Sequence, residues 1–151
     1  MNEETRPLEC LTDDQLLVET KRLVQCERSA TAAVLRSLME VDARRLYLRE
    51  GCSSLFTYCT QVLHLAEAAA YNRIEAARAA RRVPEVLVAL EQGALTLTAV
   101  RLLAPHFTPD NHREVIAGAR HKSKRDVEVL VAALAPRAPV GTVVQRCPSD
   151  G

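Results

Sequence analysis

Residues 64–82 read "HLAEAAAYNRIEAARAARR", a stretch with eight alanines, no glycine and no proline. Alanine is the strongest helix former and no helix breaker interrupts the stretch, so we predict a helix over Ala66–Arg82. Two interpretations of this composition remain open. The helix either packs closely against a neighbouring helix and turns its arginines toward a polyanion, or it is a solvated helix on the surface.

The composition of the whole chain agrees with a helical fold. The chain has 151 residues, of which 48% are hydrophobic, and it contains only five aromatic residues and no tryptophan. The core must therefore be built from Leu, Val and Ala, which favours helices over sheets. We find no convincing strand-like alternation in the sequence. The prediction is one all-α domain of about seven helices, long enough to bury a core.

The segment that precedes the alanine-rich stretch predicts one long helix over residues 12–50. Thr12 followed by Gln15 forms a capping box, and no proline or glycine occurs between them and Gly51. Apolar residues recur there at steps of three, four or seven: Leu17, Val24, Leu35, Leu38, Val41 and Leu48, with Thr31 as a weaker member. The helix is either broken near Ser29–Thr31 or extends to meet a partner helix in a homodimer.

The remaining boundaries follow from capping residues, prolines and glycines. We predict an N-terminal arm over residues 1–11, a helix-turn-helix over residues 54–82, a helical bundle over residues 84–136 and a linker or tail over residues 137–151. Within the helix-turn-helix the first helix is Leu55–Leu63. Within the bundle the helices are expected at Glu85–Gln92, from Thr96 to Pro105, from Thr108 to about His121, and from Ser123 to Pro136.

The predicted helix-turn-helix suggests contact with duplex DNA. In such a unit the second helix lies in the major groove and the arginines contact phosphates. Asn72 is the best candidate for a base edge, because a carboxamide can bind adenine with two hydrogen bonds. The full set of candidates on this helix is Tyr71, Asn72, Arg73, Arg78, Arg81 and Arg82. Helical hairpins also occur in all-α domains of every kind, so a purely structural role remains open.

A second basic segment lies further along the chain. Residues 64–125 carry a net charge of +4, although the chain as a whole carries only +1. Within the motif "RHKSKRD", Lys122, Lys124 and Arg125 are predicted to lie in a solvated loop that contacts phosphate.

The chain shows no catalytic or cofactor motif. The histidine and asparagine residues Asn111, His112 and His121 fall on a predicted helix, whereas a His-Asn-His nuclease site needs a β-hairpin before its helix. Only five glycines occur and they are scattered, so no phosphate-binding loop can be placed. We therefore expect no catalytic residue, no metal and no cofactor in this chain.

The five cysteines contain no CxxC pair and are odd in number: Cys10, Cys26, Cys52, Cys59 and Cys147. This pattern predicts free thiols in a reducing cytoplasm rather than zinc ligands or disulfides. Cys26 and Cys59 are expected at core or boundary positions on helices. Charges interrupt every apolar stretch, so neither a signal peptide nor a membrane span is predicted.

Three segments in this order resemble a bacterial family. They are "EVDARRLYLREGCSSLFTYCTQVLHLAEAAAYNRIEAARAARRVPEVL", "GALTLTAVRLLAPHFTPDN" and "ARHKSKRDVEVLVAALAPR". They are similar to the helical N-terminal region found upstream of an HNH endonuclease domain. The resemblance spans about Leu11 to Pro139 and implies a DNA-associated helical domain. More distantly, "VPEVLVALEQGALTLTAVRLL" resembles the helix-turn-helix core of ParB-type partition proteins.

The chain departs from the family pattern at three positions and in one larger respect. Ala66 and Ala68 stand where the family often has serine and glycine, and Asn72 stands where it has arginine. No HNH domain is present up to Gly151, so no catalytic residue can be carried over. We therefore expect a non-catalytic DNA-binding domain; the alternatives are a helical dimerisation module and the N-terminal fragment of an HNH endonuclease.

Overall fold

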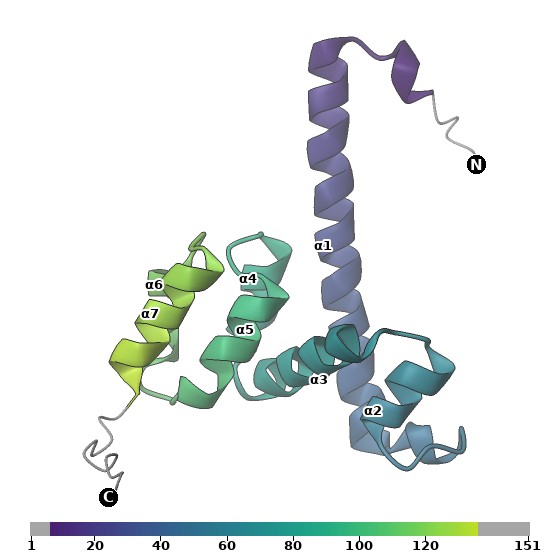
Figure 1. Ribbon diagram of the computed structural model, residues 1–151, viewed down its shortest axis with the longest axis vertical. Coiled ribbons are helices and arrows are strands. Elements are labelled where there is room, and N and C mark those ends of the chain that lie inside the picture. The colour runs from purple at the N-terminus through teal and green to yellow at the C-terminus, as the bar shows by residue number, and fades with distance from the viewer. Residues whose placement is uncertain (1–6, 136–151) are drawn as a thin grey trace, which may run out of the picture.

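The computed structural model describes residues 7–135, and within that range it contains seven α-helices and no strand (Figure 1). The all-α prediction is confirmed. The helices are α1 (Asp13–Arg44), α2 (Leu55–Thr57), α3 (Glu67–Arg82), α4 (Glu85–Glu91), α5 (Leu97–Leu103), α6 (His112–Ala119) and α7 (Lys124–Leu134). Most of the predicted N-terminal arm and all of the predicted linker over residues 137–151 lie outside the described residues.

Helix α1 is continuous, so the break considered near Ser29–Thr31 does not occur. It begins with the predicted capping box, in which the Thr12 hydroxyl accepts from the Gln15 amide at 3.1 Å. It ends at Arg44, six residues before the predicted end at residue 50, because Arg45 adopts a left-handed conformation with φ 53°. A straight continuation would turn Tyr47 about 120° away from the direction of Leu35. The turn instead buries Tyr47 in the core.

The two halves of α1 have different surroundings. In the C-terminal half Ala32, Leu35 and Leu38 are buried, and this half packs against α3 and α4. In the N-terminal half, residues 13–30, no residue is buried. Figure 1 shows the upper part of this half rising clear of the other helices, and near its lower end Gln25 Nε2 donates to the Glu91 carbonyl at 2.9 Å; we call residues 13–30 the α1 arm. Residues 31–44 are called the α1 root.

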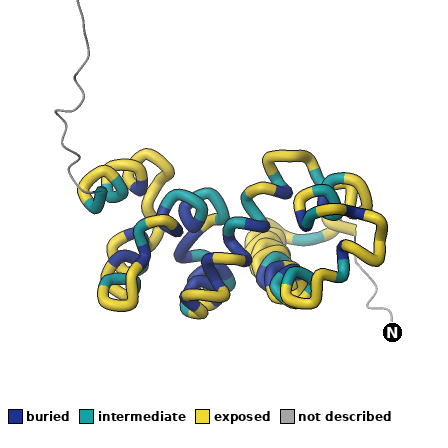
Figure 2. The backbone as a smooth tube through the Cα atoms, turned by 90° about the horizontal axis from the view of Figure 1, so that it is seen from below, coloured by how far each residue is buried: buried dark blue, intermediate teal, exposed yellow. Residues whose placement is uncertain are grey.

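Helix α3 lies at the centre of the molecule, where it packs against α1, α2, α4 and α5. The alanine-rich stretch is therefore a packed helix rather than a solvated one. Short side chains allow neighbouring helices to approach closely. The buried residues of α3 are Ala70, Ile74, Ala76, Ala77, Ala79 and Ala80. Figure 2 shows that buried residues gather along the helices beside α1.

The predicted helical hairpin is present with an irregular first half. Helix α2 has only three residues and continues as a π-helical turn, η3 (Tyr58–Val62). His64 then adopts a left-handed conformation with φ 58°, and the Leu65 amide donates to the Cys59 carbonyl at 3.0 Å. Ala66 occupies the N-cap position of α3 without a side-chain hydrogen bond. The start of α3 thus lacks the stabilisation that a serine cap gives.

The C-terminal helices begin close to their predicted starts, with one exception. The hydroxyls of Thr96 and Ser123 cap α5 and α7 as expected. Helix α6 begins at His112 rather than at Thr108, because Thr108 and Asn111 bond each other's backbone amides across a turn. After α5 a 3₁₀ turn, η4 (Ala104–His106), continues through Pro105.

Candidate functional site

The arginines at the end of α3 bond to neighbouring helical elements on two sides. Arg78 Nε lies 3.6 Å from Asp42 Oδ2, and Arg81 donates to the carbonyl of Met39, so both side chains contact the α1 root. Arg82 Nη2 donates to the Ala104 carbonyl at 3.2 Å, on the side of η4. These three guanidinium groups are therefore engaged within the molecule and do not form one surface.

The candidates in the first half of α3 also have partners within the fold. Asn72 Oδ1 accepts a hydrogen bond from Arg101 Nε at 2.7 Å, and the Arg101 guanidinium carbon lies 5.9 Å from the centre of the Tyr71 ring. Arg73 Nη1 donates to the Ala69 carbonyl one turn earlier, at 3.3 Å. Sequence reasoning missed Arg101, because its partners lie on another helix about thirty residues away.

These intramolecular hydrogen bonds affect whether the polar groups of α3 are available to bind DNA. Its apolar face is buried and its polar groups bond to α1, α5 and η4. An Asn72 carboxamide oxygen that already accepts from Arg101 has to exchange that bond before its oxygen can contact a base edge. DNA recognition by α3 stays a prediction, and it would require these intramolecular bonds to open.

The predicted basic segment is exposed, but the prediction of a loop was wrong for Lys124 and Arg125, which lie in the first turn of α7 after the Ser123 cap. Its basic side chains are Arg120, His121, Lys122, Lys124 and Arg125. Among residues 7–135, no acidic group lies within ion-pairing distance of these side chains. The backbone of this segment is held in place: the His121 amide donates to the Ala94 carbonyl at 2.8 Å and the Ser123 hydroxyl accepts from Asp126.

The two basic regions are separated in the fold. Arg78 and Arg81 lie beside the α1 root, whereas the basic segment lies at the far side of α4 and α5 (Figure 1). The structure therefore does not bring all the candidate DNA-binding residues into one surface.

The histidine-containing segment forms an ion-pair cluster at the start of α4. His112 Nε2 lies 3.5 Å and Arg113 Nε 3.8 Å from Glu85 Oε2. The pKa of Glu85 is lowered, first by a hydrogen bond from its own backbone amide and then by the charge of His112. Within the described part of the chain, no group of three His, Cys, Asp or Glu side chains is arranged to hold a metal ion.

The α1 arm carries an exposed apolar face. We define this face by Leu16, Leu17, Thr20, Leu23 and Val24, which fall within a sector of about 120° around the helix. The exposed fractions are 39% for Leu16, 62% for Leu17, 46% for Leu23 and 37% for Val24. The Thr20 hydroxyl donates to the Leu16 carbonyl at 2.9 Å, so it needs no other partner if the face is covered.

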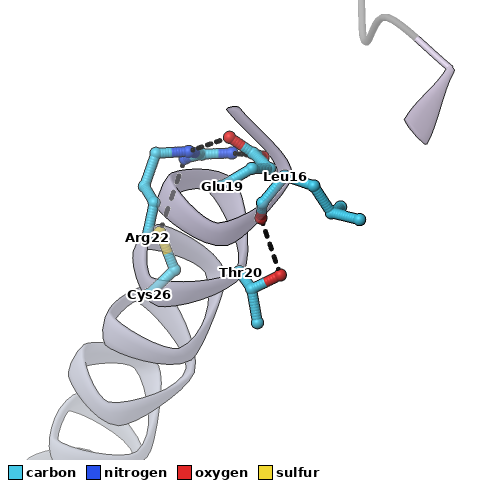
Figure 3. A network of polar contacts seen from close by, with 5 residues as sticks. All are labelled: Leu16, Glu19, Thr20, Arg22 and Cys26. Carbon is cyan, nitrogen blue, oxygen red and sulfur yellow. Dashed lines mark hydrogen bonds and ion pairs between the residues drawn. The ribbon is translucent and has the colours of Figure 1, made fainter. Parts of the chain in front are cut away.

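The opposite side of the arm is mostly polar, although it also carries the exposed Val18. The Arg22 guanidinium bonds to the Glu19 carboxylate at 2.7 Å and approaches the Cys26 sulfur at 3.7 Å. Figure 3 shows that the Leu16 side chain points away from these three residues. The arm is thus amphipathic, and it meets the rest of the chain at its C-terminal end, where Gln25 Nε2 donates to the Glu91 carbonyl at 2.9 Å.

The described cysteines are all free thiols. Cys52 and Cys59 are buried, and burial raises the pKa of Cys59 above its ordinary value. Cys26 is exposed on the arm, so the expectation that it occupies a core or boundary position is wrong. The sequence pattern could not reveal this, because exposure depends on whether another helix covers the arm, and none of those in residues 7–135 covers Cys26. Cys147 lies outside the described residues.

Comparisons with protein families, curated proteins and solved structures found no match to this chain. The resemblance to the HNH-associated domain and to ParB-type proteins therefore stays a prediction. Separately, none of the helices in residues 7–135 combines the length and the apolar character needed to cross a bilayer.

Proposed function

We propose that this chain is a helical interaction module that self-associates through the apolar face of the α1 arm. One observation carries the proposal: Leu16, Leu17, Leu23 and Val24 share a face that is exposed over its whole length. Residues 13–30 form a helix whose two sides differ in polarity, which is the pattern of a helix that packs against one partner.

The energetics of an isolated arm support the same conclusion. Most helices in proteins are held by packing of an apolar face rather than by helix propensity. Fully burying one Leu or Val side chain contributes about 1.5–3 kcal/mol. The four side chains of this face therefore offer a substantial gain to a second helix, whereas in the monomer they contribute little.

Light scattering over a concentration series tests the proposal. We expect wild-type dimers and a monomeric Leu17→Glu/Val24→Glu variant, because two charges would be buried at the contact. Cys26→Glu/Ser29→Glu is the matched control, since it adds the same charge on the exposed polar side and should remain dimeric. Leu38 is unsuitable for this test: it is 3% exposed, so a charge there would damage the core instead.

A monomeric wild-type protein at every concentration would refute self-association. A charged double variant that remains as dimeric as its control would locate the contact elsewhere on the molecule. Circular dichroism of each variant checks that the helices persist.

Contact with DNA through the basic residues 120–125, which span the connection after α6 and the first turn of α7, is the second candidate. The observation that favours it is the run of five exposed basic side chains without acidic partners among the described residues. Flexible exposed cations suit phosphate, which attracts them without regard to sequence. Membership of the HNH-associated family, and a place in the reducing cytoplasm, would go with this candidate.

Binding of duplex DNA at several salt concentrations tests the second candidate. Replacing Lys122, Lys124 and Arg125 by alanine should weaken binding and flatten the salt dependence by about 0.9 for each phosphate that is no longer neutralised. The matched control removes three exposed arginines from the α1 root and the segment after it: Arg36, Arg44 and Arg49. Equally weakened binding in both variants would indicate a net-charge effect and reject this segment as the DNA-binding surface.

A further inference from the structure

A stripe of residues spaced by seven runs along both halves of α1. Its members are Leu17, Val24, Thr31 and Leu38. Leu17 and Val24 are 62% and 37% exposed, whereas Leu38 is 3% exposed because the rest of the chain covers it. One side of the same helix is therefore open over the arm and occupied over the root.

This change of surroundings restricts how a second α1 can lie on the apolar face. In a parallel pair the partner helix would continue from the arm along the root, where the stripe is already covered. In an antiparallel pair it would continue past the N-terminal end of the arm, away from the covered part. We propose that two copies pair their α1 arms antiparallel, with the bodies at opposite ends of the dimer; this rests on the proposed self-association.

The charges along one edge of the apolar face fit this orientation. Asp14, Lys21 and Arg28 follow one another at steps of seven, so the edge is acidic near the N-terminal end and basic toward the body. A two-fold axis perpendicular to the helices brings each edge beside the same edge of the partner, with its direction reversed. Asp14 of each copy then lies beside Arg28 of the other, and this contact occurs twice, whereas the two Lys21 side chains lie opposite each other at the axis.

Double electron–electron resonance between spin labels measures the orientation. Ser37 is exposed on the α1 root, so Ser37→Cys provides the label site in a chain whose Cys10, Cys26 and Cys147 are replaced by serine. With the arms paired over residues 13–28, the antiparallel dimer separates the two labels by about 50 Å along the helix axis. A parallel pair with axes about 8–10 Å apart would bring the labels within about 25 Å.

The possible results separate the two proposals. A dimer by light scattering with a label separation near 50 Å supports the antiparallel arrangement. A dimer with a short separation overturns the orientation and leaves self-association standing. A labelled protein that is monomeric, like unlabelled wild type, overturns both. The Leu17→Glu/Val24→Glu variant in the same background should lose the 50 Å distance, and its persistence would show that another surface makes the dimer.

Discussion

The arm and the root of α1 belong to one continuous helix with one apolar stripe, yet only the root is part of the core. Leu35 and Leu38 are 0% and 3% exposed, whereas Leu17 is 62% exposed. The apolar spacing is the same in both halves. The difference shows that apolar spacing alone does not determine whether one side of a helix is buried within the chain.

The largest expected effect is on the free energy of unfolding when one leucine in each half of α1 is replaced by alanine. Leu35→Ala should lower the free energy of unfolding by about 2–5 kcal/mol, because it leaves a cavity in the core. Leu17→Ala should change the stability of the monomer by less than about 0.5 kcal/mol. Urea unfolding at low protein concentration, where association is weak, measures both. Equal destabilisation would mean that the arm is packed within the monomer.

A smaller effect is expected where the arm first meets the rest of the chain. Gly93 has φ +78°, and a β-carbon there would lie 2.5 Å from Arg28 Cζ. Gly93→Ala should therefore cost about 1–2 kcal/mol of backbone strain and also displace the Arg28 side chain. Gly51 has φ +80° and open space around it, so Gly51→Ala is the matched control for strain alone.

Thermal unfolding of Gly93→Ala and Gly51→Ala is measured with and without Arg28→Ala. The comparison shows how much of the lost stability at position 93 comes from contact with Arg28. Removing Arg28 should relieve part of the cost at position 93 and none at position 51. If Arg28→Ala changes both costs alike, Arg28 does not pack over Gly93.

The smallest effect concerns the polar side of the arm. A hydrogen bond from Arg22 lowers the pKa of Glu19 below its ordinary value of 4.5. The stabilising effect of this pair on the helix is complete above pH 4.5 and is lost as pH falls through the lowered pKa. NMR titration should show the Glu19 pKa rising toward its ordinary value in Arg22→Ala. An unchanged Glu19 pKa in that variant would show that the pair does not form in solution.

Local chemistry made most helix starts predictable from the sequence. The Thr12 capping box and the Thr96 and Ser123 caps use residues three positions apart, and the structure contains all three. The end of α1 was mispredicted, because Tyr47 reaches the core only after a left-handed turn at Arg45. No local pattern reports that long-range requirement.

The candidate site was less predictable for the same reason. Arg81 and Arg101 bond to groups 42 and 29 residues away, so their availability depends on how α1, α3 and α5 pack. The exposure of Cys26 depends on the absence of a covering helix within the described chain. Sequence reasoning identified the exposure of the basic segment, because connections between helices are exposed in most folds, but it placed Lys124 and Arg125 in a loop rather than on α7.

The alanines of α3 have a consequence for sequence variation. Ala70, Ala76, Ala77, Ala79 and Ala80 each have 0–2% exposure in the contacts of the central helix. Even one added methylene group at such a position would force neighbouring backbones apart. Mutational tolerance should therefore be narrow in α3, with glycine and serine as the smallest changes, and broad along the arm, where any apolar side chain preserves the face.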